Sequence, residues 1–268
     1  QLPAKCLNQF ALRFHAGGTL QGLRDSERWL AASAEAWVAQ GLDERLIPAM
    51  TSLVGDLIQR NEDIAELLWQ LLPEADFERA EHRFPHGRIP ADLVEQSAGL
   101  VAQWDQLNRD ATRLEAALEN SQTSGSSSTD NTFATTAYPD LNLANAQGLV
   151  ARAEQQLAVW RAFADAPGEG ESGDGWARWC QHRGTPQSLE CQASPILPGE
   201  LLHDALWQRA AGAVITSATL SALGTFERFR ERSGVPIGAR WKQVASPFDP
   251  QKATFCVPAM TTEPGNQE

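Results

Sequence analysis

Residues 91–118 have the sequence ADLVEQSAGLVAQWDQLNRDATRLEAAL and follow directly after Pro90. Apolar side chains recur along this stretch every three or four positions, with Gln, Asp, Arg and Glu between them. An α-helix places residues of this spacing on one face. The apolar stripe consists of Leu93, Leu100, Val101, Trp104, Leu107, Ala111, Leu114 and Leu118. The spacing predicts a long helix that belongs to a bundle or to a coiled-coil-like arm.

Further helical patterns flank this stretch. Apolar residues recur at helical spacing within residues 25–40, 46–58, 63–72 and 141–164. Residues 121–136, SQTSGSSSTDNTFATT, contain almost no apolar side chain, so they predict a mobile loop. Two long helices joined by such a loop predict an antiparallel helical hairpin.

The last hundred residues have a different pattern. Leu189, Cys191 and Ala193 alternate with polar neighbours, as in a strand, and residues 200–211 form a short amphipathic pattern. The apolar run 213–215 predicts a buried strand, residues 223–232 a helix and residues 253–257 another strand. Alternating strands and helices predict a parallel α/β sheet, of which the chain supplies an edge portion.

Composition and charge limit the function classes. The 268 residues carry a formal net charge of −12, which would repel DNA or an anionic membrane at long range. A nucleic-acid role therefore needs a local basic groove or domains outside this piece. No apolar run is long enough to span a bilayer, and the N-terminus has no secretory pattern. The chain begins with Gln1 rather than Met, which we interpret as a start inside a longer or processed polypeptide.

The four cysteines are Cys6, Cys180, Cys191 and Cys256. Their spacing matches neither a zinc site nor an iron–sulfur site, although Cys180 and Cys191 could approach each other. Buried or incidental thiols in a reduced, cytoplasmic protein fit this pattern best.

The strongest local motif is Thr216-Ser217-Ala218-Thr219-Leu220, directly after the apolar run 213–215. A buried strand would deliver three hydroxyl groups to its C-terminal end, where open α/β sheets bind ligands. There, short hydroxyl side chains can hydrogen-bond an acidic motif or a metal-bound water. A Ser/Thr-rich turn that caps the next helix through Thr219 or Ser221 is the competing interpretation.

This motif resembles motif III of the superfamily-2 helicases of the XPD/DinG type. Four further matches follow the family order and lie at Gln1–Pro3, Glu81–Pro90, Ser246–Asp249 and Val257–Pro264. The resemblance implies an internal piece of an ATP-driven motor that moves 5′ to 3′ on single-stranded DNA and unwinds forks and R-loops in repair or replication. The fold it implies is mixed, with an arch-like helical hairpin or bundle inserted into part of a parallel α/β motor domain.

The resemblance also implies a division of the chain. Residues 1–14 would end the first motor domain, and residues 15–175 would form the arch-like insertion that contains the loop 121–136. Residues 176–235 would return to the first motor domain with motif III, and residues 236–268 would begin the second.

Site residues follow from the same resemblance. Ser217 and Thr219, with Thr216, would couple ATP hydrolysis to DNA movement. Arginines and a lysine in two locally basic stretches are weaker candidates for DNA phosphate contacts, with surface salt bridges as the alternative; these residues are Arg83, Arg88, Arg240 and Lys242. No metal ligands are predicted, because Pro85 interrupts the helix that a His82–His86 pair would need.

Cofactors and partners are expected only for the longer enzyme. The chain has neither a GxxxxGKS or GxxxxGKT phosphate loop nor an Asp-Glu-Ala-His motif, so ATP and Mg²⁺ have no site in it and we predict no hydrolysis by this piece alone. The family's 4Fe–4S cluster would take its ligands from outside this chain. Single-stranded, forked or R-loop DNA and a replication or repair protein are the expected partners.

Two other functions stay open at this point. The first is a non-enzymatic helical module that docks a partner protein, and the second is an unrelated α/β enzyme with a helical insertion. Five tryptophans on helical apolar faces could stack bases, although core packing is the better interpretation; they are Trp29, Trp37, Trp69, Trp104 and Trp160.

Overall fold

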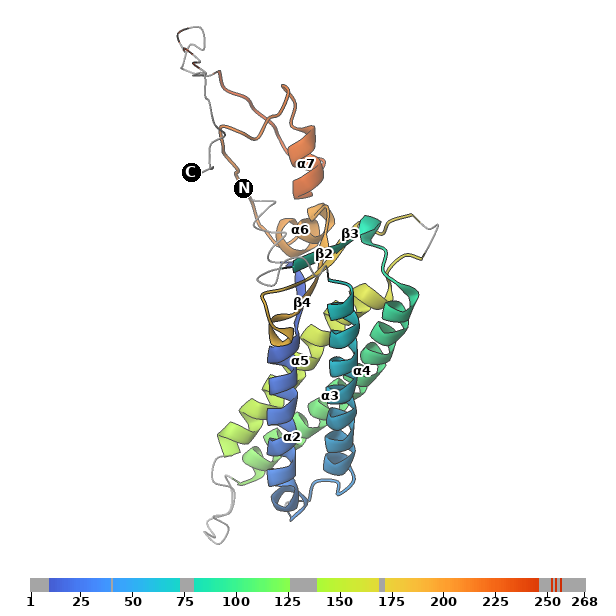
Figure 1. Ribbon diagram of the computed structural model, residues 1–268. Helices are drawn as coiled ribbons and strands as arrows, with labels where there is room; N and C mark the ends of the chain where they lie inside the picture. The colour runs from blue at the N-terminus through green and yellow to red at the C-terminus, as the bar shows by residue number, and fades with distance from the viewer. Residues whose placement is uncertain are drawn as a thin grey trace.

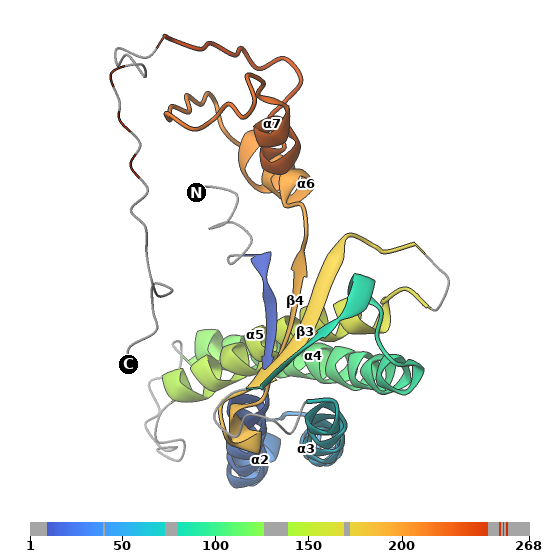
Figure 2. The same ribbon diagram turned by 45° about the horizontal axis from the view of Figure 1, so that its top comes forward.

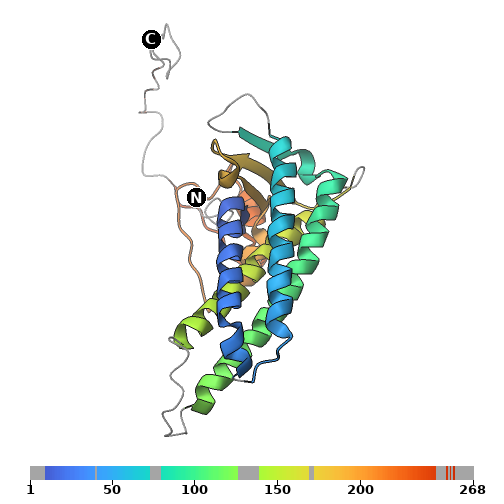
Figure 3. The same cartoon turned by 60° about the horizontal axis from the view of Figure 1, so that its bottom comes forward.

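Four long helices dominate the computed structural model, which describes residues 10–39, 41–72, 80–125, 139–168 and 172–245, with 252, 254 and 256. They are α2 (Ala16–Ala39), α3 (Leu46–Gln70), α4 (Ala91–Gly125) and α5 (Pro139–Ala164). Figures 1 and 3 show them side by side, extending from one small sheet. Helices α4 and α5 run in opposite directions in close contact, which confirms the predicted helical hairpin.

The bundle core is built from the predicted apolar stripes. Leu93, Leu100, Leu107 and Leu114 of α4 are completely buried. The tryptophans behave as core residues, as predicted: three are at most 1% exposed, and the other two pack against the core from its edge. The buried ones are Trp37, Trp104 and Trp160, and the partly buried ones are Trp29 and Trp69.

The helices are longer than the sequence patterns predicted. Helix α2 begins at Ala16 rather than near residue 25, because its first buried face carries small residues such as Thr19 and Gly22 instead of large apolar ones. A Cβ atom on Gly22 would lie 2.6 Å from the guanidinium carbon of Arg152, so a larger residue there would displace the Arg152 side chain. Small residues weaken the apolar periodicity without weakening the packing, and the pattern therefore missed this turn.

Two predicted helix boundaries also shift. Residues 46–58 and 63–72 belong to one helix, α3, in which the buried Asn61 donates its side-chain N–H to the carbonyl oxygen of Leu57 at 2.7 Å. Helix α4 continues through residues 121–125, where the Ser121 hydroxyl donates to the carbonyl oxygen of Leu118 at 2.8 Å. The loop predicted at 121–136 is therefore helical at its start, and its remainder lies outside the described residues.

A four-stranded sheet covers one end of the bundle (Figure 2). Its order is β1 (Leu12–His15), β4 (Glu190–Pro195), β3 (Trp176–His182) and β2 (Ala80–Phe84), and every neighbouring pair is antiparallel. Only the strand near residues 189–193 was predicted. The expected parallel sheet is not formed by the described strands. The short segment 183–189 joins β3 directly to β4, and a connection of this length allows only antiparallel pairing. Strands β1 and β2 add to the two edges of this pair, also antiparallel, across the long helical segments.

The face of the sheet toward the bundle is apolar at its centre and carries polar side chains such as Arg178 and His182 nearer its β2 side. Phe14, Cys191, Cys180 and Ala193 are completely buried there, and the ring of Phe14 lies 4.8 Å from that of Trp160 in α5. Cys180 and Cys191 are directly opposite each other in the register, so the predicted approach of these two thiols is confirmed. The sheet thus joins segments that we assigned to different domains, and the division itself stays a prediction.

The segment after β4 continues beyond the end of that strand, away from the four long helices (Figures 1 and 2). It contains α6 (Gly199–Leu202), the π-helical turn η3 (His203–Trp207) and α7 (Glu227–Ser233). Two hydrogen bonds join η3 to the end of α7. The Trp207 indole N–H donates to the Ser233 carbonyl oxygen at 2.6 Å, and His203 Nδ1 lies 3.1 Å from the Gly234 carbonyl oxygen. These helices are shorter than predicted.

The buried strand predicted at residues 213–215 is not formed. These residues have no regular secondary structure, and the side chain of Val214 is 90% exposed. An apolar run becomes a buried strand only where another strand pairs with it, and no described residue does so here. The strand predicted at 253–257 lies largely outside the described residues.

Candidate nucleic-acid interface

The hydroxyl motif forms an exposed turn. Ser217 Oγ accepts a hydrogen bond from the Thr219 backbone N–H at 3.2 Å and lies 3.2 Å from Thr219 Oγ1. This closed pair explains why the chain turns here. The competing capping interpretation is wrong for the described structure, because α7 begins only after Phe226 and has no side-chain cap. The Thr216 side chain is exposed at the start of the turn.

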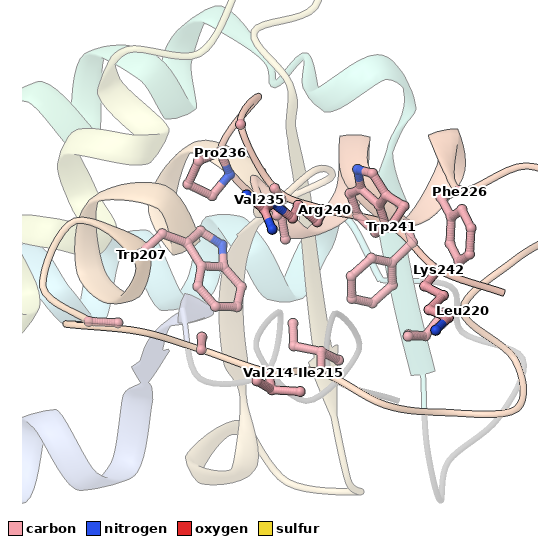
Figure 4. A pocket seen from close by; sticks show the side chains of 15 residues that line it. Trp207, Val214, Ile215, Leu220, Phe226, Val235, Pro236, Arg240, Trp241 and Lys242 are labelled. Carbon is pink, nitrogen blue, oxygen red and sulfur yellow. The ribbon is translucent and has the colours of Figure 1, made fainter. Parts of the chain in front are cut away.

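An apolar hollow of about 560 Å³ adjoins this turn. Trp207, Ile215 and Leu220 line it, and the stacked rings of Phe226 and Trp241 form another part of the wall, with centroids 5.1 Å apart. Figure 4 shows these side chains surrounding the hollow. The arrangement provides planar aromatic surface beside the hydroxyl turn.

The two predicted cations of this segment, Arg240 and Lys242, also line the hollow and are exposed. The structure therefore brings them close to the hydroxyl turn, which Ile215 and Leu220 flank. Cations beside aromatic rings can contact phosphates while bases stack. The DNA-binding role of both residues stays a prediction.

A second hollow, of about 590 Å³, lies at the β2 edge of the sheet. The predicted residues Arg83 and Arg88 line it, together with Trp176 and Trp179. The Arg83 side chain is 83% exposed, and its Nε donates to Glu81 Oε1 at 2.5 Å. The two hollows share no lining residue, so the structure separates the predicted cations into two pairs.

A buried arginine holds this second hollow in shape. The side chain of Arg178 is 1% exposed and donates to the carbonyl oxygens of Gly87 at 3.0 Å and Ala162 at 2.6 Å. It also contacts both carboxylate oxygens of Asp174, at 3.1 and 2.5 Å. Burial alone raises the pKa of Asp174, but the hydrogen bonds from Arg178 and from the Trp176 backbone N–H, with the charge of Arg178, lower it below its usual value.

The turn that Arg178 holds is η1 (Pro85–Gly87). His86 has a φ of 56° and Gly87 a φ of 73°, both in the left-handed region. A Cβ atom on Gly87 would collide with the carbonyl oxygen of Trp176, so glycine is required at that position. The turn places His86 beside Arg88 in the wall of the hollow. No three His, Cys, Asp or Glu side chains converge as a metal site within the part of the chain that the structure describes.

The sequence patterns did not identify Trp176, Arg178 and Trp179 as residues of this second hollow. Residues 176–182, WARWCQH, do alternate between two faces, but Arg178 occupies the buried face and hides the apolar periodicity. A buried arginine becomes acceptable because Asp174 and two carbonyl oxygens satisfy it. The alternation of Ala177, Trp179 and Gln181 on the other face was the available signal.

No family model matches the chain. The protein named "ATP-dependent DNA helicase DinG" of Photobacterium profundum is 30% identical to it over 189 residues, which are 68% of this chain and 26% of that protein. The protein of the same name from Escherichia coli K12 is 27% identical over 190 residues, which are 70% of this chain and 25% of that protein. The chain is DinG-like.

The similarity has clear limits in length. The DinG-like chain spans about a quarter of the length of these two relatives. A shorter match joins it to the "3'-5' exonuclease DinG" of Bacillus subtilis, with 36% identity over 80 residues, 29% of this chain and 9% of that protein. No described helix has the length and apolar character that crossing a membrane requires.

Proposed function

We propose that this DinG-like chain is part of an ATP-dependent 5′–3′ DNA helicase that acts in DNA repair or replication. The similarity to proteins named as ATP-dependent DNA helicases, over about 70% of the chain, carries the proposal. In this proposal residues 15–175 form an arch-like insertion between parts of the first motor domain, 1–14 and 176–235, and residues 236–268 begin the second. The exonuclease activity named for the Bacillus relative is not proposed, because that match covers 9% of that protein.

The motif III turn would couple hydrolysis to movement in the longer enzyme. Ser217 and Thr219 hold each other at 3.2 Å, and the exposed hydroxyl of Thr216 stands beside them. Val214, which precedes the turn, exposes 90% of its side chain. An exposed apolar run is suited to pairing with a neighbouring strand, which would bury it and place the hydroxyl turn at the edge of a nucleotide cleft.

ATP, Mg²⁺ and a 4Fe–4S cluster belong to the longer enzyme in this proposal. The chain contains no phosphate loop. Of its described cysteines, Cys180 and Cys191 are buried on paired strands, whereas Cys256 is exposed, so these thiols do not fit a cluster. We assign none of these groups to described residues, and we expect the chain alone to hydrolyse no ATP.

Single-stranded DNA is the proposed ligand of the chain itself. Arg240 and Lys242 line the hollow beside motif III, and Arg83 and Arg88 line the hollow at the sheet edge. Cations that contact phosphates release counterions, so binding should weaken steeply with salt despite the net charge of −12. Forked or R-loop DNA and a replication or repair protein are proposed as partners of the longer enzyme.

The test is fluorescence anisotropy of a labelled single-stranded oligonucleotide with the 268-residue chain across a salt series. We expect binding at low salt, and the variants Arg240→Ala and Lys242→Ala should each lower the salt slope by about one. The control is Arg109→Ala, which removes an exposed cation from α4 and should leave binding unchanged. No binding at low salt, or ATP hydrolysis by the chain alone, would contradict the proposal.

A further inference from the structure

The face of the sheet turned away from the bundle carries polar and charged side chains. Alternate residues of each strand lie on this face, because neighbouring side chains along a strand point to opposite sides. Phe14, Cys191 and Cys180 are buried on the bundle side, which places Arg13, Gln192 and Trp179 on the other side. We call this the outer face of the sheet.

The strand register aligns four of these outer residues in one row. Arg13 is opposite Gln192, Gln192 is opposite Trp179, and Trp179 is opposite Arg83. The row therefore reads arginine, glutamine, tryptophan, arginine across all four strands. With strands spaced by about 4.8 Å, the two arginine positions are about 14 Å apart.

The two ends of the row are available to a ligand. Arg13 is exposed, and no ion-pair partner for it occurs among the described residues. Arg83, on the edge strand β2, pairs with Glu81 through Nε, but its side chain is 83% exposed, so a phosphate can still approach its guanidinium group. Arginine guanidinium groups bind phosphate through two parallel hydrogen bonds, so each end of the row can hold a phosphate.

The centre of the row is held in place by hydrogen bonds. Gln192 is 7% exposed, and its side-chain N–H donates to Glu190 Oε2 at 3.0 Å. Gln181 donates to the same oxygen at 2.8 Å from the neighbouring strand. These bonds fix the polar surface beside Trp179, so the ring has a rigid support.

Core packing against the described residues does not explain Trp179. Its side chain is half-buried, yet it is not among the residues that pack against the hydrophobic core, whereas Trp176 is. Its ring instead lines the hollow of about 590 Å³ at the sheet edge, together with Arg88 and His86. A tryptophan in this setting offers a planar surface to a flat ligand group.

We propose that the outer row Arg13–Gln192–Trp179–Arg83 is a platform for single-stranded DNA, on which an unpaired base stacks on Trp179 while Arg13 and Arg83 contact phosphates. The proposal rests on the proposed function and adds Arg13 and Trp179 as binding residues. A sheet that presents aromatic rings between cations is a recurrent way to hold unpaired bases. An acidic peptide would also meet the arginines, but it would make no use of the Trp179 ring between them.

The experiment compares variants of the 268-residue chain by anisotropy with a labelled oligothymidylate. Trp179→Leu should weaken binding about tenfold, whereas Trp179→Phe, which keeps an aromatic ring, should retain most of it. Arg13→Ala should lower the salt slope by about one, and Arg109→Ala on α4 is the matched control. Circular dichroism checks that each variant keeps the helical content of the unaltered chain.

A second measurement does not depend on the folding of any variant. Ultraviolet cross-linking of the unaltered chain to an iodouracil-substituted oligonucleotide joins a base to an aromatic ring in direct contact with it. Mass spectrometry of the digested product should locate the cross-link in the peptide that contains Trp179. A cross-link confined to other peptides would overturn the platform.

The outcomes separate this inference from the proposed function. If the chain binds DNA and Arg240→Ala weakens binding, while Arg13→Ala and Trp179→Leu behave like the control, the platform is wrong and the proposed function stands. If the unaltered chain binds no single-stranded DNA at low salt, both are wrong. If an acidic peptide displaces the oligonucleotide as well as unlabelled DNA does and no Trp179 cross-link forms, the row is a protein-binding surface instead.

Discussion

Replacing Asp174 by alanine tests whether the buried arginine organises the sheet edge. The Arg178 guanidinium is 1% exposed and has three acceptors: Asp174 and the carbonyl oxygens of Gly87 and Ala162. Without Asp174 its charge stays buried with only the two carbonyl groups. Breaking a buried ion pair costs about 3–5 kcal/mol, but the Asp174 side chain is 28% exposed and water can replace part of the contact. We therefore expect a loss of about 2–3 kcal/mol in the free energy of unfolding.

The matched control is Asp105→Ala, which also removes a carboxylate from an arginine. Asp105 contacts Arg109 and Arg161, and all three side chains are at least 37% exposed. Exposed pairs contribute about 1 kcal/mol or less. Urea unfolding followed by far-ultraviolet circular dichroism at neutral pH measures both losses. Equal losses in the two variants would refute the argument that burial of Arg178 sets the cost.

The stabilisation by Asp174 should also depend on pH in a defined direction. The pKa of Asp174 is lowered in the folded chain, so its ionised form stabilises the fold at any pH above the ordinary aspartate pKa of about 3.9. This contribution is lost as the pH falls through the lowered folded value. The difference in unfolding free energy between the unaltered chain and Asp174→Asn should be constant near neutral pH and shrink below about pH 4. A difference that stays constant throughout acid titration would show that the carboxylate charge plays no part.

Two further predictions concern chemical and proteolytic access. Burial raises the pKa of Cys180 to about 12 and that of Cys191 well above its usual value. Iodoacetamide at mildly alkaline pH should therefore label the exposed Cys256 and leave both buried thiols unmodified until urea is added. Mass spectrometry that finds Cys180 or Cys191 labelled in the folded chain would contradict this. Limited trypsin digestion should cut after Arg209, in the exposed segment that follows η3, before it cuts after Arg113, whose side chain is 71% exposed but lies within α4. Cleavage in the reverse order would show that α4 opens more easily than this segment.

The helices were predictable because their apolar stripes are long and regular. Leu93 and Trp104 recur with their neighbours over several turns, and the structure buries both completely. The sheet was not predictable in this way, because its strands are short and mix charges into both faces. In β2, AEHRF, and β3, WARWCQH, the side chains of His82 and Arg178 face the bundle. Arg178 is satisfied by Asp174, four positions before it, and by the carbonyl oxygens of Ala162 and Gly87. The two carbonyl groups come from other elements of the fold, so no local pattern reveals that this arginine can be buried.

The candidate site likewise has one part that the sequence could locate and one part that it could not. The exposed turn at Thr216, Ser217 and Thr219 could be located from the sequence, because the motif itself is contiguous. The row that joins Arg13 to Trp179 could not, because it exists only through the register of β1, β4 and β3. Residues far apart in the chain meet there, and pairing them requires the strand order, which the sequence patterns did not predict. The parallel strand direction that they did predict is not found among the described strands.

Apolar residues that we predicted to be buried are exposed in the segment after β4, where no described residues pack over them. The hydrophobic core of the bundle and sheet includes residues from Phe14 to Ala193, and no described residue after Ala193 belongs to it. In the following segment Val214, Leu223 and Ile237 expose between 86% and 103% of their side chains. Each exposed aliphatic side chain forgoes about 1.5–3 kcal/mol of burial, so this segment leaves much of its apolar surface unused. The bundle and the sheet share one core, whereas the segment after β4 has apolar surface that the described residues leave uncovered. In the longer enzyme that we propose, other parts of the protein would cover this surface.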